Sequence, residues 1–157
     1  MKEISLTQGQ VALVDDDMFE ELNQFKWCVH KKPNTFYAKR ILEGTRRPLF
    51  MHHVLLPKKE GYEIDHIDRD GMNNQRENLR YATHSQNIAN CMTKRTYGYK
   101  GISFDRSTVF RSKRWQAAIR KDQKAYYLGR YETPIEAAQA YDRAAVKLFG
   151  EFALTNF

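Results

Sequence analysis

A chain of 157 residues with a net charge of +7 can form one ordinary domain or two small ones. Hydrophobic residues make up 41% and aromatic residues 13%, which excludes a disordered tail. The N-terminus lacks the apolar core of a signal peptide and no apolar run is long enough to cross a membrane, so we expect an intracellular protein. Cys28 and Cys91 have no Cys-x-x-Cys partner, which argues against a zinc knuckle, and we expect both to be small buried thiols.

The first 57 residues predict a leader of mixed strands and helix. Strands are expected at 3–7 and 11–14, a helix from Asp16 or Asp17 to about Phe25, and further strands near 27–30 and 36–41. Phe19, Leu22 and Phe25 fall at helical spacing and are expected to belong to the core. This order of elements favours an α+β fold.

Residues 62–92 predict a hairpin followed directly by a helix. Residues 62–67 alternate as a strand, residues 68–74 are rich in turn formers, and residues 79–82 can pair back as a second short strand. The segment from Thr83 to Gln86 then predicts a helix start, with the Thr83 hydroxyl as N-cap.

Four side chains of this segment form a set suited to hydrolysis. Asp65 and His66 lie on the first strand, Asn78 precedes the second strand, and Asn87 falls in the first turns of the helix. Carboxylate and amide oxygens suit a hard divalent cation, and a neutral histidine can take a proton from water. The set predicts metal-assisted hydrolysis, and the alternative is a structural hairpin without chemistry.

The apolar run at 49–56 contains a further histidine, His52. Two interpretations stay open for it: a contact to the phosphate in the active site, or a histidine at the edge of a short core helix.

Positive charge is concentrated in one part of the chain. Residues 94–131 hold 11 Lys/Arg and 2 Asp/Glu, a balance of +9 within the overall +7, and these charges alternate with aromatic residues at strand spacing. Such a block favours contact with nucleic-acid phosphates over a merely solvated face.

Residues 99–157 predict a three-stranded sheet covered by one helix. Strands are expected at 101–104, 114–121 and 124–131, and the helix runs from the N-cap Thr133 to Gly150. Along the middle strand, Trp115, Ala117 and Ile119 should face the helix, which leaves Gln116, Ala118 and Arg120 on an open face.

The spacing Asp65-His66, Asn78 and Asn87, with its Asn74-Gln75-Arg76-Glu77-Asn78-Leu79 context, resembles the HNH nuclease family over roughly residues 50–92. The resemblance implies a ββα-metal fold with His66 as general base, Asp65 and Asn87 as ligands of Mg²⁺ (Mn²⁺ being an alternative), and Asn78 as the residue that braces the loop and orients the base. It also makes His52 a candidate contact to the active-site phosphate.

The C-terminal third resembles the plant ethylene-response-factor DNA-binding domain. Its matching segments include Gly101-Ile102, residues 115–120, Leu128-Gly129-Arg130-Tyr131, Ala140-Tyr141-Asp142 and Leu154-Thr155-Asn156-Phe157. The resemblance implies a sheet lying in the DNA major groove. The expected DNA-binding residues are Arg111, Lys113, Arg114, Gln116, Arg120, Lys124 and Tyr127. Ser103, Asp105 and Ala118 depart from the plant pattern, so the plant target sequence does not carry over.

Together these patterns predict three parts: residues 1–92 as an HNH nuclease domain with its leader, 93–98 as a basic linker, and 99–157 as a DNA-binding domain. The combination is similar to phage and intron-associated homing endonucleases, which implies a site-specific, metal-dependent endonuclease acting on double-stranded DNA in the cytoplasm of a bacterial or phage-infected host. No membrane association and no obligate protein partner are expected, and monomer and dimer stay open. The alternatives are a DNA-binding regulator with an inert HNH module and a nonspecific nuclease.

Overall fold

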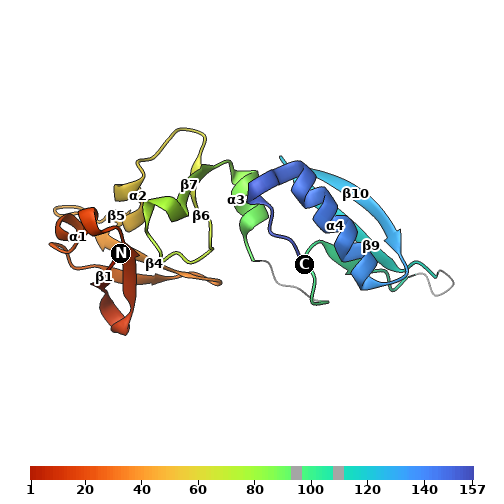
Figure 1. Cartoon of the computed structure of the whole chain (residues 1–157), viewed down its shortest axis with the longest axis horizontal. Helices are drawn as coiled ribbons and strands as arrows, with labels where there is room; N and C mark the ends of the chain where they lie inside the picture. Colours follow the sequence, from red (N-terminus) through yellow and green to blue (C-terminus); the bar gives the residue numbers. More distant parts are fainter. Residues whose placement is uncertain (93–96, 108–111) are drawn as a thin grey trace. The chain divides into compact units, whose positions relative to one another are not determined.

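The computed structural model describes residues 1–92, 97–107 and 112–157. The chain divides into two compact units, Met1–Thr83 and His84–Phe157. Both units mix short helices with small antiparallel sheets, so the α+β expectation is confirmed (Figure 1). No helix of the described residues has both the length and the apolar character needed to span a membrane.

Three small sheets build the first unit. The elements in chain order are β1 (Lys2–Ser5), β2 (Val11–Val14), α1 (Asp16–Leu22), β3 (Cys28–Lys31), β4 (Phe36–Ile41), β5 (Pro48–Phe50), α2 (Met51–Leu55), β6 (Glu63–His66) and β7 (Leu79–Ala82), with short 3-10 turns at Thr7–Gly9 and Arg76–Asn78. β1 pairs with β2, β4 lies between β3 and β5, and β6 pairs with β7, all antiparallel. The core gathers residues from the leader, from α2 and from the loop after β6, including Ile4, Val14, Leu22, Trp27, Met51 and Met72.

The helix α1 is shorter than expected. It ends at Leu22, and the next residue, Asn23, caps it. Leu22 uses its carbonyl oxygen to accept a hydrogen bond from the Trp27 indole at 2.8 Å, which fixes the chain just after the helix. Phe25 therefore lies outside the helix and is 41% exposed, stacked under the Arg40 guanidinium at 3.9 Å, so the expectation of a core residue is wrong.

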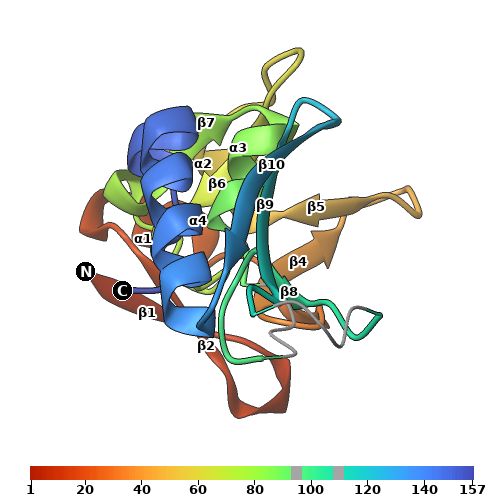
Figure 2. The same ribbon diagram turned by 90° about the vertical axis from the view of Figure 1, so that its right-hand side faces the viewer.

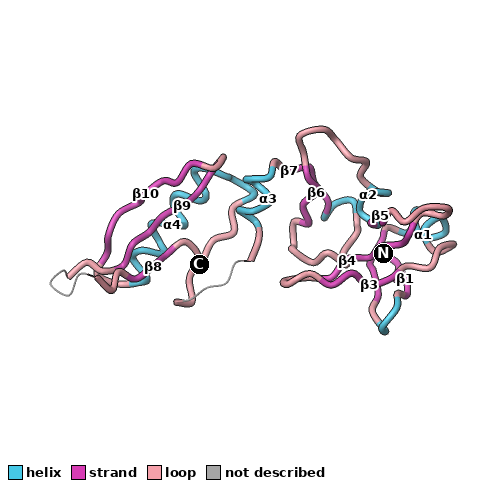
Figure 3. The backbone as a smooth tube through the Cα atoms, turned by 180° about the vertical axis from the view of Figure 1, so that it is seen from behind, coloured by secondary structure: helices cyan, strands magenta, loops and turns pink. Residues whose placement is uncertain are grey.

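The loop between β6 and β7 passes beside β4 of the leader (Figure 3). Leu13 on β2 exchanges two backbone hydrogen bonds with this loop: its N–H donates to the Met72 carbonyl at 2.9 Å, and its carbonyl accepts from the Asn74 N–H at 2.8 Å. The loop packs tightly against β4, because a Cβ atom on Gly71 would lie 2.4 Å from the Phe36 carbonyl oxygen. Only glycine fits there, so the leader fixes the path of the loop.

In the second unit one helix covers one face of a sheet (Figure 2). Its elements are α3 (His84–Asn90), β8 (Ile102–Phe104), β9 (Trp115–Lys121), β10 (Lys124–Tyr131), α4 (Pro134–Phe149) and a 3-10 turn at Gly150–Phe152. The sheet has the order β10-β9-β8. Ala117 on β9 packs against Ala137 and Ala140 on α4, where small side chains let the helix approach the sheet closely. The Thr133 hydroxyl accepts the Glu136 N–H at 3.2 Å, the N-cap that the sequence predicts.

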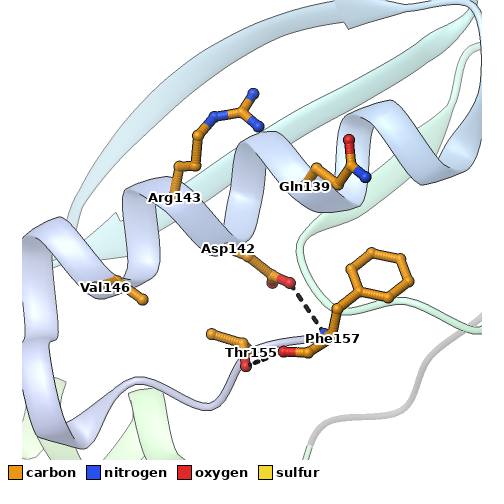
Figure 4. Close-up of a pocket in the computed structure, with 6 residues that line it drawn as sticks. All are labelled: Gln139, Asp142, Arg143, Val146, Thr155 and Phe157. Atoms are coloured by element: carbon orange, nitrogen blue, oxygen red, sulfur yellow. Dashed lines mark hydrogen bonds between the residues drawn. The ribbon is translucent and has the colours of Figure 1, made fainter.

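Asp142 on α4 latches the end of the chain. Its carboxylate accepts the backbone N–H groups of Asn156 and Phe157 at 2.9–3.1 Å, and Asn156 in turn accepts the Lys100 N–H at 2.6 Å. Figure 4 shows the hydrogen bond from the Phe157 N–H to the Asp142 carboxylate beside that from the Thr155 hydroxyl to the Phe157 carbonyl, which is 2.8 Å long. The tail therefore joins α4 to the chain before β8.

The helix α3 is fastened within the second unit by a buried lysine. Lys100 is 6% exposed, and its ammonium group donates to the carbonyl oxygens of Ala89 and Cys91 at the end of α3. The Leu154 N–H also donates to Ala89, at 3.3 Å. At the start of α3, the Ser85 hydroxyl accepts the N–H of Asp122, in the turn between β9 and β10. Three segments of the second unit thus hold α3: the chain before β8, the turn between β9 and β10, and the C-terminal tail.

Both cysteines are exposed, so the expectation of buried thiols is wrong. Cys28 lies on β3 with its side chain on the solvent side, and Cys91 follows the last residue of α3. Cys28 thus lies on an edge strand, because β3 pairs with β4 alone.

Candidate active site and candidate nucleic-acid interface

Asp65 and His66 end β6 and are both buried, with exposures of 4% and 5%. The register of the hairpin places Asp65 directly opposite Arg80 on β7. The Arg80 Nε atom donates to Asp65 Oδ2 at 2.9 Å, and the two side chains are only 13% and 5% exposed. A guanidinium in this position compensates a carboxylate that burial would otherwise destabilise. Sequence reasoning did not single out Arg80, although the predicted pairing of the two strands places it opposite Asp65.

The surroundings of His66 favour the neutral imidazole. Burial lowers the pKa of His66 below its ordinary value of 6.5. Three neighbouring carboxylates and one amide act in the opposite direction by stabilising the charged ring, and burial outweighs them. A neutral histidine is the form that can accept a proton near pH 7. The opposing groups are Asp68, Asn74, Asp65 and Asp70.

The Asn78 side chain joins the two ends of the loop between β6 and β7. Its amide nitrogen donates to Asp68 Oδ1 at 2.9 Å and to the Asn73 carbonyl at 2.8 Å, and its amide oxygen accepts the Asp68 N–H at 3.0 Å. Asn73 donates to the second oxygen of Asp68 at 2.7 Å. Since Asn78 is 6% exposed, these bonds satisfy polar groups that water could not reach. The loop that follows His66 is therefore held by side chains as well as by the leader.

His52 lies on α2 with its ring 5.2 Å from that of His66, edge to face, and Tyr37 contacts both rings. Burial, the neighbouring His66 and His53 lower the pKa of His52 to about 3, so it is neutral at physiological pH. His52 also lines a hollow of about 470 Å³ together with Lys58 and Lys59. The short helix that one of the two interpretations of His52 requires is present as α2. The hollow also gives His52 access to a basic surface, so the phosphate contact stays a prediction.

The proposed metal ligands differ in their surroundings. Asp65 belongs to the first unit, and Asn87 lies half-buried on α3 in the second unit. Their joint ligation of a cation stays a prediction. Within the described residues, no three His, Cys, Asp or Glu side chains converge on one point. The predicted pair of one carboxylate and one amide is a smaller set of hard oxygen donors, and such donors suit Mg²⁺. An ionised carboxylate accepts through two oxygens, so Asp65 can serve Arg80 and a cation together.

The open face of the second unit carries most of the predicted DNA-binding residues. Ala117 and Ile119 are buried toward α4 while Ala118 and Arg120 are exposed, which confirms the predicted division of β9 into two faces. Tyr127, opposite Ala118, is 63% exposed. Of the remaining candidates, Lys113 and Lys124 are exposed, Arg114 and Gln116 are half-buried, and Arg111 lies outside the described residues.

Arg130 joins this face, although sequence reasoning passed over it. Simple alternation from Tyr127 would turn Arg130 toward the helix. The register of β10 against β9 shifts between Tyr127 and Gly129, and beyond this bulge Arg130 lies opposite Gln116. Gly129 has a φ of +122°, which side-chain-bearing residues rarely adopt. The Leu128-Gly129 step is thus the sequence signal that could have located the bulge.

Comparison with known proteins supports two resemblances. Residues 56–89 match the family model described as HNH endonuclease. An uncharacterized HNH endonuclease of Acanthamoeba polyphaga mimivirus is 29% identical over 152 residues, which cover 95% of this chain and 76% of the viral protein.

Plant proteins match a shorter part of the chain. An AP2-like ethylene-responsive transcription factor of Arabidopsis thaliana is 46% identical over 59 residues, or 38% of this chain and 11% of the plant protein. APETALA2-like protein 2 of Oryza sativa subsp. japonica is 44% identical over 52 residues, or 32% of this chain and 12% of the plant protein. The chain thus carries an HNH endonuclease domain at residues 56–89 and is partly similar to plant AP2-like DNA-binding domains.

Proposed function

We propose that this protein is a site-specific, metal-dependent DNA endonuclease of the homing type. The observation that carries the proposal is the buried pair Asp65-His66 at the end of β6, inside the segment that matches the HNH endonuclease family. The basic open face of the second unit supports double-stranded DNA as the substrate.

His66 acts as the general base in this proposal. Its neutral imidazole takes a proton from water as the oxygen attacks a backbone phosphorus. Asn78 and Asp68 keep the following loop in place, so that the imidazole is presented in one orientation. His52, which is neutral and lies beside Lys58 and Lys59, donates a hydrogen bond to a phosphate oxygen.

Asp65 and Asn87 would hold Mg²⁺, or Mn²⁺ in its place, within a ββα-metal arrangement of β6, β7 and α3. When bound, the cation supplies electrostatic stabilisation of charge on the leaving 3′ oxygen. The protein keeps a compensating cation, Arg80, against Asp65, which holds the carboxylate in position. The products implied by the HNH resemblance carry 5′-phosphate and 3′-hydroxyl ends.

The second unit reads the DNA in this proposal. Arg120 and Tyr127 project from the open face and are suited to base contacts, while Lys113, Arg114 and Lys124 are suited to phosphates. One chain carries one such nuclease site, so one binding event cuts one strand, and a double-strand break requires a second attack or a dimer.

A plasmid-nicking assay tests the proposal. Its substrate is a supercoiled plasmid that carries the DNA flanking the protein's own gene, and nicking converts it to the open-circular form. We expect nicking in magnesium, none in excess EDTA, and strong losses for Asp65→Ala and Asn87→Ala that higher magnesium or manganese partly restores. Asp65→Asn is the matched variant, because it keeps the side-chain shape and removes the charge. Full activity in excess EDTA would eliminate the one-metal scheme.

A DNA-binding regulator with an inert HNH module is the second candidate. The Asp65–Arg80 ion pair is the observation that favours it, because the pair occupies one carboxylate oxygen and leaves fewer acceptor sites on Asp65 for a cation. The same assay separates the two: a regulator binds the plasmid and leaves it supercoiled at every magnesium and manganese concentration.

A further inference from the structure

Asp105 forms the centre of a hydrogen-bonded cluster on the open face of the second unit. Although it is an acidic residue in the basic part of the chain, its side chain is only 10% exposed. Its Oδ2 atom accepts Arg130 Nη1 at 2.6 Å and Gln116 Nε2 at 3.2 Å. Its Oδ1 atom accepts the N–H and the hydroxyl of Ser107 at 2.9 and 2.6 Å. Both carboxylate oxygens are thus bound by protein donors from β9, from β10 and from the loop after β8.

Two separate features of the fold bring the side chains of Asp105, Gln116 and Arg130 together. β9 and β10 place Gln116 and Arg130 opposite each other, and the bulge at Leu128 turns Arg130 to the open face. The Asp105 backbone pairs with Arg114, its N–H donating to the Arg114 carbonyl at 2.9 Å, and this fixes Asp105 at the edge of the same face. The cluster therefore depends on the sheet itself and not on a chance meeting of long side chains.

The carboxylate also determines what its two partners present outward. A carboxylate only accepts hydrogen bonds, so Gln116 must turn its NH₂ group inward, which leaves its amide oxygen as the acceptor for another molecule. Arg130 spends one terminal nitrogen on Asp105 and keeps further N–H donors in a rigid plane. The pair thus offers a fork of donors next to a single acceptor.

We propose that Asp105 is a positioning residue that holds Arg130 and Gln116 as a base-reading pair in the DNA major groove. This inference rests on the proposed function of the second unit as a DNA reader. The donors of Arg130 match guanine O6 and N7, and the acceptor of Gln116 matches the exocyclic amino group of adenine or cytosine. The pair therefore reads a guanine next to a base that offers such an amino group.

The negative charge of Asp105 makes a positioning role distinguishable from a purely structural role. An acidic side chain on a surface that meets phosphates weakens binding to every DNA sequence, because like charges repel. Its removal should then leave general affinity unchanged or stronger, while Arg130 and Gln116 lose their fixed directions and discrimination falls. A residue that only stabilised the sheet would lower both affinities when removed.

The experiment uses the full chain with His66→Ala, so that the DNA is bound and not cut. A duplex selected from a random pool by this protein and a shuffled duplex of the same composition are compared at one salt concentration. We expect Asp105→Ala to lower the ratio of the two affinities by on the order of ten-fold, as for a lost bidentate base contact. The affinity for the shuffled duplex should stay the same or rise.

Three further variants complete the test. Arg130→Ala should lower the ratio at least as much, and adding Asp105→Ala to it should change little more, because both act through one contact. Glu132→Gln removes the same charge from an exposed position after β10, so it should leave the ratio unchanged. Lys124→Ala should weaken both duplexes equally and reduce the salt dependence by about one unit.

The outcomes are distinguishable. An unchanged ratio in Asp105→Ala, or an equal loss on both duplexes with a lower unfolding temperature, would overturn the positioning role while the parent protein still selects a preferred duplex. A parent protein that selects no duplex at all would instead overturn the proposed reading of DNA by the second unit, and with it this inference.

Discussion

The two units hold their polar side chains in opposite ways. In the first unit, Asp65, His66 and Asn78 are buried, and Asp65 and Asn78 are held by hydrogen bonds to neighbouring groups. In the second unit, Arg120 and Tyr127 stand exposed on an open sheet face. Burial tunes protonation and fixes one orientation, which acid–base chemistry needs, whereas exposure leaves charge available to a large partner. Substitutions should therefore affect chemistry and stability in the first unit and binding alone in the second.

The largest effect is expected for His66→Ala. The cleavage rate should fall by about 10²–10⁴-fold, the usual contribution of a positioned acid–base group, while DNA affinity stays close to that of the parent protein. Single-turnover cleavage and a gel-shift titration on one duplex measure the two quantities. Near-parental cleavage by this variant would remove His66 from the mechanism.

Asn78→Ala should lower both stability and rate. The substitution deletes three part-buried hydrogen bonds to Asp68 and to the Asn73 carbonyl, each with a net contribution of about 0.5–1.5 kcal/mol. We expect a loss of about 2–3 kcal/mol in the free energy of unfolding of the first unit. The matched control is Arg120→Ala, an exposed change that should alter stability by less than about 0.5 kcal/mol.

Each unit contains one of the two tryptophans, Trp27 and Trp115, so their fluorescence can report unfolding separately in single-tryptophan variants. If Asn78→Ala left the Trp27 transition where it is in the parent protein, the loop would not depend on this side chain, and the contrast between the units would lose its energetic basis.

A smaller effect is expected from pH. Burial lowers the pKa of His52, to about 3, and those of His66 and His53 below 6.5. The unfolded chain binds protons near pH 6.5 while the folded first unit resists them, so the stabilisation is fully present above pH 6.5 and is lost as the pH falls below it. Urea unfolding followed through Trp27 between pH 7.5 and 5 measures this loss.

In His52→Gln, the free energy of unfolding should depend less steeply on pH, because one histidine with a lowered pKa has been removed. Cleavage should also persist somewhat below pH 6.5, since His66 stays neutral there. A Trp27 transition that does not move between pH 7.5 and 5 would contradict the buried histidine cluster.

Local patterns predicted more of the fold than of the site. The bounds of β2, β4 and β7 follow the predicted ranges, because alternation and turn formers are written in consecutive residues. Arg80 and Arg130 escaped attention because their places depend on pairing between strands: Arg80 through its register opposite Asp65, and Arg130 through a bulge that reverses the expected face. Phe25 followed helical spacing but lay beyond the point where the Trp27 indole fixes the chain.

The anchoring of α3 by Lys100 also bears on how such a protein can be assembled in evolution or by gene fusion. The segment matching the HNH endonuclease family ends at residue 89, on a helix whose carbonyl groups are bound by a lysine eleven residues further along the chain. A recombination junction in the basic linker would separate the helix from that lysine. We therefore expect exchange of the C-terminal part for another reader to succeed only when the incoming sequence supplies its own cap for α3.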